Sequence, residues 1–224
     1  TNAHPHSVGK YTVVHNGIIE NYSTLKEELK IRGYTFKSET DTEVIPALLD
    51  YYYKNEQDII KTINKVSKIL KGSFALGIIC SDDPDALYAL KNSSPLIIAK
   101  SKSGSFLASD VPAILKYTNK YMLLDDTDMA KITKDNITIY DANLNIINKE
   151  TLTFTGSKKT AEKNGYEHFM LKEINEQDEV FKDTIGSYFD GTIDSLENNF
   201  GFLKKFKKID IVACGSAYHT GCVG

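Results

Sequence analysis

The segment from Phe74 to Cys80 is almost continuously apolar, and it constrains the fold more than any other part of the chain. A strand of this composition is buried on both faces, so the sheet that contains it must be covered on both sides. Apolar residues recur at helical spacing before this segment, and short β-type runs separated by Asp- and Asn-rich turns follow it. Helices followed by a run of antiparallel strands indicate an α+β fold in which the helices form one layer on the sheet.

The boundaries of these elements follow from capping and turn residues. Ser23 to Arg32 reads as a helix that ends before Gly33, a second helix opens at Thr40 or Asp41, and a third runs from a cap at Asp58 to Gly72. Asp110 to Tyr117 is expected to form one short helix among the strands, with Asp110 as its N-cap. Strands are expected at Ala86–Leu90, Leu96–Ala99, Ser105–Ala108, Tyr121–Leu124, Met129–Lys134, Ile137–Tyr140 and Ile146–Phe154.

Composition excludes several classes of function. The 224 residues carry a formal net charge of -3, which predicts no nucleic-acid partner, and no apolar run approaches the roughly 20 residues that span a bilayer, which predicts no membrane partner. The three cysteines (Cys80, Cys214 and Cys222) are widely spaced and odd in number, as in a protein of the reducing cytoplasm. His4 and His6 flank a proline without a third ligand nearby, so neither a metal nor a cofactor is predicted.

The stretch from Tyr11 to Asn21 begins as a strand and reaches the dipeptide Asn16-Gly17. An Asn-Gly pair is the strongest short turn signal, so a plain turn is one interpretation. The other is chemical, because an Asn side chain and a Gly backbone N–H that leave a strand together form a pocket with two donors. Such a pocket can hold the oxyanion of an acyl-transfer intermediate.

Two further strings accompany this stretch, Asn2-Ala3-His4-Pro5-His6 before it and Ser38-Glu39-Thr40-Asp41-Thr42-Glu43-Val44 after it. In this order and spacing the three strings resemble the N-terminal-nucleophile class of glutamine amidotransferases, most closely the glutamine–fructose-6-phosphate aminotransferase family. The resemblance implies a four-layer sandwich of two sheets between helical layers, over residues 1–154. It also implies that Asn16 and Gly17 receive the oxyanion, and that His4 and Asp41 bind glutamine. A helix N-cap is the other interpretation of Asp41.

The remainder of the chain changes character. Residues 155–165 are polar with a glycine near each end, which predicts a linker. Residues 166–189 have a long helical pattern, and the string from His168 to Gln177 resembles the segment that leads into the sugar-isomerase (SIS) part of the family. Residues 166–224 are therefore expected to begin an α/β sugar-isomerase domain.

The end of the chain predicts a buried parallel-type strand over 208–214 that enters a Gly-Ser loop before a helix. By resemblance, Gly215 and Ser216 are candidates to bind a sugar phosphate. Many family members have Thr-Ser where this chain has Ser216-Ala217, so the side-chain contact at Ala217 is missing.

The family's nucleophile is an N-terminal cysteine, whereas residue 1 here is threonine. The resemblance therefore predicts a fragment of a cytoplasmic, homodimeric enzyme that uses glutamine and fructose 6-phosphate, without the nucleophile segment and with little activity of its own. Three alternatives stay open: another amidotransferase of the same class, such as the phosphoribosyl-pyrophosphate enzyme; a non-catalytic phosphosugar-binding module; and a hydrolase in which Thr1 is the nucleophile.

Overall fold

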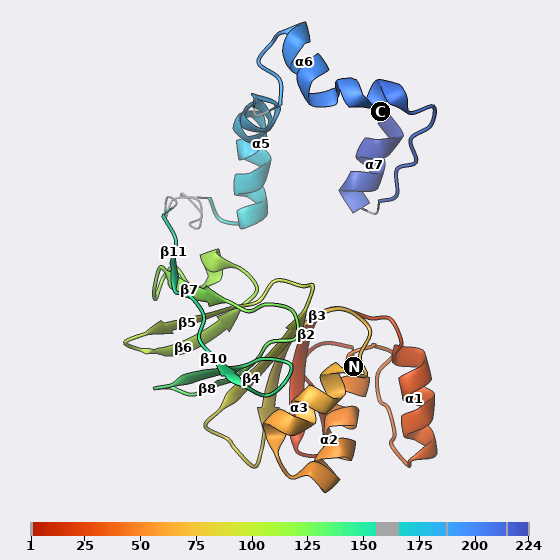
Figure 1. Cartoon of the computed structure of the whole chain (residues 1–224), viewed down its shortest axis with the longest axis vertical. Helices are drawn as coiled ribbons and strands as arrows, with labels where there is room; N and C mark the ends of the chain where they lie inside the picture. The colour runs from red at the N-terminus through yellow and green to blue at the C-terminus, as the bar shows by residue number, and fades with distance from the viewer. Residues whose placement is uncertain (1, 156–165, 187, 214, 224) are drawn as a thin grey trace. The chain divides into compact units, whose positions relative to one another are not determined.

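The computed structural model describes residues 2–155, 166–186, 188–213 and 215–223. The chain divides into two compact units, Thr1–Glu162 and Lys163–Gly224, which are taken separately below (Figure 1). Thr1, Cys214 and all but the first residue of the predicted linker lie outside the described residues.

The first unit contains two antiparallel sheets. The larger sheet has seven strands in the order β1-β2-β3-β4-β8-β9-β10, and the smaller has four in the order β11-β7-β5-β6. Strands of the larger sheet are β1 (His6–Val8), β2 (Tyr11–Ile19), β3 (Gly72–Cys80), β4 (Leu87–Asn92), β8 (Met129–Ile132), β9 (Ile137–Tyr140) and β10 (Ile146–Ile147). Those of the smaller sheet are β5 (Ile97–Ser101), β6 (Gly104–Ala108), β7 (Lys120–Leu123) and β11 (Leu152–Thr153).

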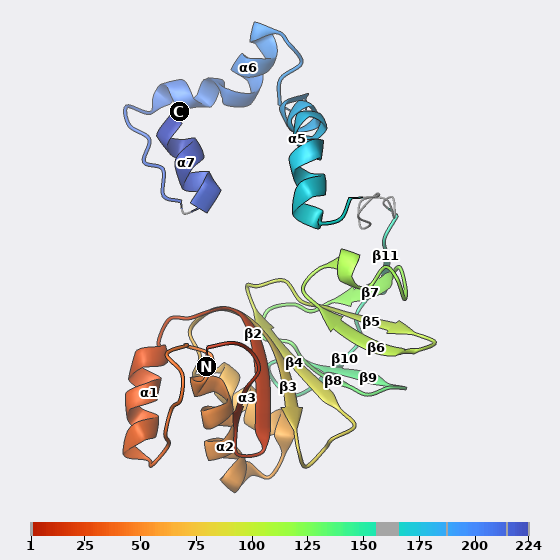
Figure 2. The same ribbon diagram turned by 180° about the vertical axis from the view of Figure 1, so that it is seen from behind.

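Three helices cover one face of the larger sheet, and the smaller sheet covers the other (Figures 1 and 2). The helices are α1 (Tyr22–Ile31), α2 (Val44–Glu56) and α3 (Ile59–Ser67). Because side chains alternate along a strand, β3 packs Phe74, Leu76 and Ile78 against the helices and Ala75 against the smaller sheet. The 3-10 turn η1 (Val111–Ala113) supports the outer face of the smaller sheet, so the predicted fourth layer is a single turn in the described part of this unit.

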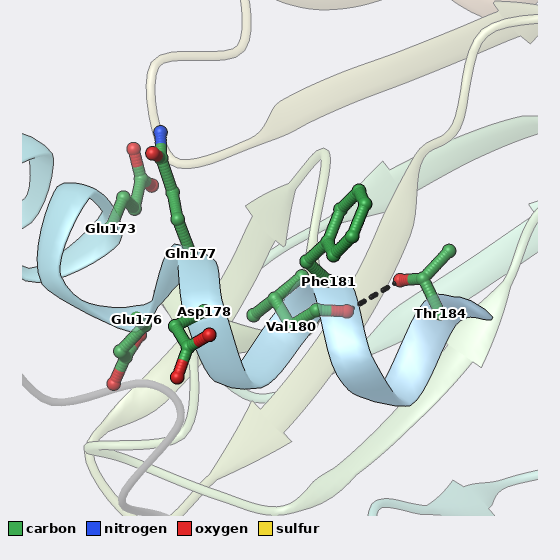
Figure 3. A pocket seen from close by; sticks show the side chains of 7 residues that line it. All are labelled: Glu173, Glu176, Gln177, Asp178, Val180, Phe181 and Thr184. Atoms are coloured by element: carbon green, nitrogen blue, oxygen red, sulfur yellow. Dashed lines mark hydrogen bonds between the residues drawn. The ribbon is translucent and has the colours of Figure 1, made fainter. Parts of the chain in front are cut away.

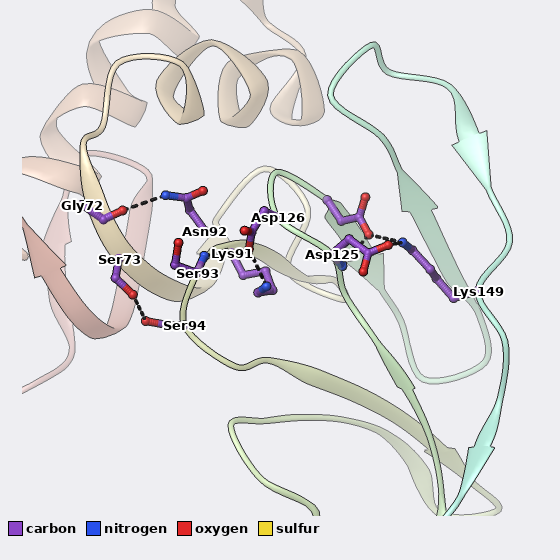
Figure 4. Close-up of polar contacts among 10 residues, drawn as sticks. Gly72, Ser73, Lys91, Asn92, Ser93, Ser94, Asp125, Asp126 and Lys149 are labelled. Atoms are coloured by element: carbon purple, nitrogen blue, oxygen red, sulfur yellow. Dashed lines mark hydrogen bonds and ion pairs between the residues drawn. The ribbon is translucent and has the colours of Figure 1, made fainter. Parts of the chain in front are cut away.

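Ionic contacts hold the connections that cross between the two sheets (Figure 4). The Lys91 ammonium at the end of β4 lies 2.6 Å from a carboxylate oxygen of Asp126, which also accepts the Ser93 N–H. Lys149, before β11, contacts Asp125 and Asp128 at 2.5 Å each. The side chains of Lys149 and Asp128 are only 15% and 7% exposed, so this pair is shielded from water.

The structure corrects several predicted boundaries. Asn16-Gly17 is not a turn, because β2 continues through it to Ile19. The second helix begins at Val44 rather than at Thr40 or Asp41, and Gly72 opens β3 instead of closing α3. The expected strand Ile146–Phe154 is two short strands, β10 and β11, that belong to different sheets.

The second unit is helical in the residues that the structure describes. It contains α5 (Phe169–Gly186), α6 (Ile193–Phe200), the 3-10 turn η2 (Gly201–Lys205) and α7 (Gly215–Val223). The strand predicted over 208–214 is wrong for the described residues 208–213, which form no strand and leave Ile211 and Val212 61% and 97% exposed. A buried parallel strand needs neighbouring strands to pair with, and the described part of this unit offers none. Among the described residues, no helix is long and apolar enough to cross a membrane.

Candidate active site

Asn16 and Gly17 lie inside β2, opposite Ala75 and Phe74 of β3. Gly17 has a φ of 133°, a backbone conformation that favours glycine. A Cβ built on Gly17 would lie 2.0 Å from the carbonyl oxygen of Ser73. Conformation and contact therefore both require glycine at this position.

The backbone N–H of Gly17 points to the edge of β2 that faces away from β3. The N–H of Ser81 bonds the carbonyl of Lys10, and the N–H of Glu20 bonds the carbonyl of Lys71, both in register with the β2–β3 pairing. In an antiparallel pair, hydrogen-bonded residues alternate with residues that are not hydrogen-bonded to that partner. The even-numbered residues of β2 therefore bond to β3, and the N–H groups of the odd-numbered residues point away from β3. The other neighbour of β2 is β1, whose first residue, His6, pairs with Val13. From Val14 onward, β1 does not cover this edge of β2.

The Asn16 side chain lies on the opposite face of β2 from the helices. It is exposed, and among the described residues its amide makes no hydrogen bond. It lines a pocket of about 210 Å³ between the two sheets, together with Val14, Gly77 and Leu107. The amide is therefore free to donate to a group bound beside β2.

Asp41 lies in the loop before α2 and is fixed to β2. Its Oδ2 accepts the backbone N–H of Ile19 at 2.7 Å. The residue flanking the first turn of α2 is Glu43, so the interpretation of Asp41 as a helix N-cap is wrong. Since the N–H of Ile19 points to the same edge as that of Gly17, the carboxylate is beside the backbone donors of β2.

A threonine hydroxyl joins Asp41 to two histidines. The Oγ1 of Thr42 lies 3.4 Å from Asp41 Oδ1, 3.0 Å from His15 Nδ1 and 3.2 Å from His4 Nε2. The side chain of His15 is 2% exposed, and its buried Nε2 has no hydrogen-bond partner among the described residues. Burial lowers the pKa of His15, against the opposing effect of Asp41, so His15 is neutral at pH 7 and its 3.9 Å contact with Asp41 is not an ion pair.

The loop that carries Asp41 is held by Glu43, a residue that sequence reasoning did not single out. The Glu43 carboxylate, 5% exposed as a residue, accepts the backbone N–H groups of Lys37 and Ser38 and the Ser38 hydroxyl. Burial alone would raise the pKa of Glu43, but these hydrogen bonds outweigh it and lower the pKa. Thr42 and Glu43 both belong to the string from Ser38 to Val44, so the resemblance of that string to the family was the sequence signal that could have identified them.

The described residues supply no thiol next to Asn16 and Gly17. Cys80 is fully buried in the core under the helices, and Cys222 belongs to the second unit. No group of His, Cys, Asp and Glu in the described part of the chain is arranged to hold a metal ion. Thr1 lies outside the described residues.

A larger hollow of about 680 Å³ lies on α5 (Figure 3), but functional groups from different elements do not converge on it. Its lining side chains come from a single helix and include Val180, Phe181 and three carboxylates. Gly215 and Ser216, the candidate phosphate-binding residues, are the first residues of α7; their side chains are not described, so the structure leaves that prediction untested.

Comparison with known families identifies the protein family to which this chain belongs. A family described as glutamine amidotransferase domain matches residues 3–116, which include His4, Asn16, Gly17 and Asp41. The chain belongs to this glutamine amidotransferase family.

Relatives of this amidotransferase chain are similar over its whole length. The glutamine–fructose-6-phosphate aminotransferase (isomerizing) of Clostridium perfringens is 45% identical over 229 residues, and that of Aquifex aeolicus is 45% identical over 226. Each alignment covers 100% of this chain and 37% of the relative, so the chain spans just over a third of the length of these relatives.

Solved structures show the fold of the amidotransferase unit. The Bacillus subtilis glutamine phosphoribosylpyrophosphate amidotransferase matches with a TM-score of 0.53 and 22% identity, over 61% of this chain and 30% of that one. The expected N-terminal-nucleophile amidotransferase fold and its α+β class are thereby confirmed.

Proposed function

We propose that this chain is the glutamine-binding and oxyanion-stabilising part of an enzyme that makes glucosamine 6-phosphate from fructose 6-phosphate and glutamine. The strand β2 carries the proposal, because the N–H of Gly17 points away from β3, the Asn16 amide has no partner among the described residues, and Asp41 is fixed at Ile19 of the same strand. Relatives with this activity in their names align with the whole chain at 45% identity, which supports the choice of reaction.

In the proposed reaction a nucleophile attacks the side-chain amide of glutamine, and negative charge develops on the amide oxygen. The Asn16 amide and the Gly17 N–H receive this charge. The Gly17 N–H is in place before the reaction, since the β2–β3 pairing holds the backbone there, and the same pairing fixes the backbone from which the Asn16 side chain projects. Preorganised donors of this kind stabilise the transition state more than the substrate.

Asp41 binds the α-ammonium group of glutamine, and His4 completes the edge of the pocket. The carboxylate is suited to this role because its two oxygens are oriented from two sides, by Ile19 and Thr42. The nucleophile, an N-terminal cysteine in the family, is supplied from outside the described residues. The released ammonia passes to fructose 6-phosphate, whose phosphate is bound through Gly215 and Ser216 in a sugar-isomerase domain that begins near residue 166.

Substitution of the oxyanion donor in the full-length protein tests this proposal. Asn16→Ala is expected to lower kcat for glutamine hydrolysis by about 10²–10³ with a small change in KM. Asn143→Ala, in the exposed turn between β9 and β10, is the matched control and should leave both constants unchanged. Wild-type kcat in Asn16→Ala would remove Asn16 from the catalytic machinery.

A second assay separates the two candidate acceptors. The solved phosphoribosylpyrophosphate amidotransferase shares the fold, so phosphoribosyl pyrophosphate is a real alternative acceptor. We expect glutamine-dependent formation of glucosamine 6-phosphate, and no glutamine consumption stimulated by phosphoribosyl pyrophosphate. Glutamine hydrolysis that neither sugar phosphate stimulates would support a different aminotransferase. Loss of all activity in Thr1→Ala, with folding intact, would favour the threonine hydrolase.

A further inference from the structure

The Thr42 hydroxyl is the centre of a buried polar network under β2. It lies within hydrogen-bond distance of His15 Nδ1, His4 Nε2 and Asp41 Oδ1, at 3.0, 3.2 and 3.4 Å. Thr42 itself is 2% exposed. A hydroxyl offers one proton and two lone pairs, so three neighbours use its full capacity.

The chemistry of the neighbours fixes where the protons are. Asp41 is a carboxylate and can only accept, so the hydroxyl proton of Thr42 is directed to Asp41 Oδ1. Both hydroxyl lone pairs then face imidazole nitrogens, and each must carry a proton. This arrangement requires a proton on Nδ1 of His15 and on Nε2 of His4.

The buried environment of His15 agrees with this assignment. Its Nε2 has no hydrogen-bond partner in the part of the chain that the structure describes, and it is out of contact with water. A second proton there would create a buried cation with an unsatisfied donor, which is costly. His15 is thus a neutral ring with a single proton that is used by Thr42.

We propose that Thr42 and His15 are positioning residues for Asp41: they orient its carboxylate for the ligand's ammonium group through a fixed order of proton donation, His15 to Thr42 to Asp41. This role rests on the proposed function for the identity of the ligand, whereas the proton order does not. Without the Thr42 hydroxyl, Asp41 keeps a single hydrogen bond among the described residues, from Ile19, and can rotate about it. A rotating carboxylate binds an ammonium group less tightly, because its orientation must be fixed on binding.

Nitrogen NMR of the imidazole rings tests the proton order without any ligand. In the 224-residue chain at pH 7, His15 is expected as the Nδ1–H tautomer. Thr42→Ser keeps the hydroxyl and should keep this tautomer. Thr42→Val removes the acceptor, so the preference of His15 for the Nδ1–H tautomer should be lost. A His15 that carries its proton on Nε2, or on both nitrogens, in the wild-type chain overturns the proposal.

Glutamine binding, measured by calorimetry in the same proteins, tests the positioning role. Thr42→Val is expected to weaken binding about 10-fold, and Thr42→Ser should restore it to within about 2-fold. Thr62→Val is the matched control, because the hydroxyl of Thr62 in α3 is buried and donates to the carbonyl of Asp58, the residue that caps this helix. It should change neither the tautomer of His15 nor the affinity.

The two failures are distinguishable. The expected tautomer in a wild-type chain that does not bind glutamine would contradict the proposed function and leave the proton order intact. Equal glutamine affinities of wild type and Thr42→Val would overturn the positioning role while glutamine recognition stands. If Thr42→Val does not fold, the wild-type tautomer and the affinity of a His15→Gln variant, which should also be weakened, decide the matter.

Discussion

Asp41 accepts the backbone N–H of Ile19 at 2.7 Å, so a residue of the loop before α2 is fixed to the strand that carries Asn16 and Gly17. The contact spans 22 positions of the sequence and joins two of the three strings that first indicated the family. Loop and strand are therefore structurally coupled, and a substitution in either should affect the other.

Asp41→Asn separates charge from shape at this site. The amide oxygen can still accept the N–H of Ile19, so the free energy of unfolding should fall by no more than about 1 kcal/mol. Loss of the negative charge should weaken glutamine binding about 10–100-fold, since a charge-assisted hydrogen bond is lost. Calorimetry and urea denaturation check the two effects. Asp110→Asn, at the exposed cap of η1, removes the same charge and should leave the affinity unchanged.

Gly17→Ala should be strongly destabilising because a Cβ there meets the Ser73 carbonyl oxygen at 2.0 Å. Gly104 has a similar φ, 145° against 133°, but a Cβ on it meets nothing within 4 Å. Gly104→Ala is thus expected to cost about 1 kcal/mol from conformation alone, and Gly17→Ala at least about 2 kcal/mol more from displacement of the backbone. Chemical denaturation of both variants measures the difference, and equal losses would show that β2 and β3 separate freely at this point.

Glu43→Gln should destabilise the first unit in a pH-dependent manner. The hydrogen bonds from Lys37 and Ser38 lower the pKa of Glu43 from its ordinary 4.5, so its contribution to stability is complete above that value. The contribution is lost as the pH falls through the lower folded-state pKa. The variant should therefore be about 2 kcal/mol less stable than wild type at pH 7, and the gap should shrink in acid.

Urea denaturation of wild type and Glu43→Gln at pH 7 and at a pH below the ordinary 4.5 measures this gap. A constant gap would mean that Glu43 acts through its shape rather than its charge. Glu27→Gln is the control, because Glu27 is exposed on α1 and its pair with Lys30 is open to water. It should change stability by less than about 0.5 kcal/mol at either pH.

Lys149→Met should loosen the connections between the two sheets. It leaves Asp128, whose side chain is 7% exposed, without its cation, and an uncompensated buried charge typically costs about 3 kcal/mol or more. Lys30→Met removes an exposed partner of Glu27 and should cost less than about 0.5 kcal/mol. Thermal unfolding compares the two variants. Adding Asp128→Asn to Lys149→Met should recover part of the loss, since it removes the stranded charge.

Local sequence patterns correctly predicted the elements whose structure is decided by residues close together in the sequence. Asp58 caps α3 by accepting the Lys61 N–H, and Gly33 follows the end of α1 with a φ of 90°. The apolar run at Phe74–Cys80 is a core strand, as its composition required. In each case the residues that decide the structure are neighbours in sequence.

The misplaced elements depend on distant partners. Asn16-Gly17 has the composition of a turn, but pairing with Ala75 and Phe74 carries the strand through it. The run before Cys214 has the composition of a buried strand and stays unpaired among the described residues, because strand formation requires a neighbour. Likewise the Thr42 network joins residues up to 38 positions apart, which no local pattern predicts.

The contact between Asp41 and Ile19 also bears on strand addition at the edge of β2. In the described part of the chain β1 pairs with β2 only as far as Val13, and an unpaired strand edge is a template on which another polypeptide can add as a strand. A carboxylate seated on a backbone N–H of that edge interrupts the template with a negative charge. Asp41 is therefore expected to oppose the addition of another strand here, besides its proposed role in binding a cationic ligand.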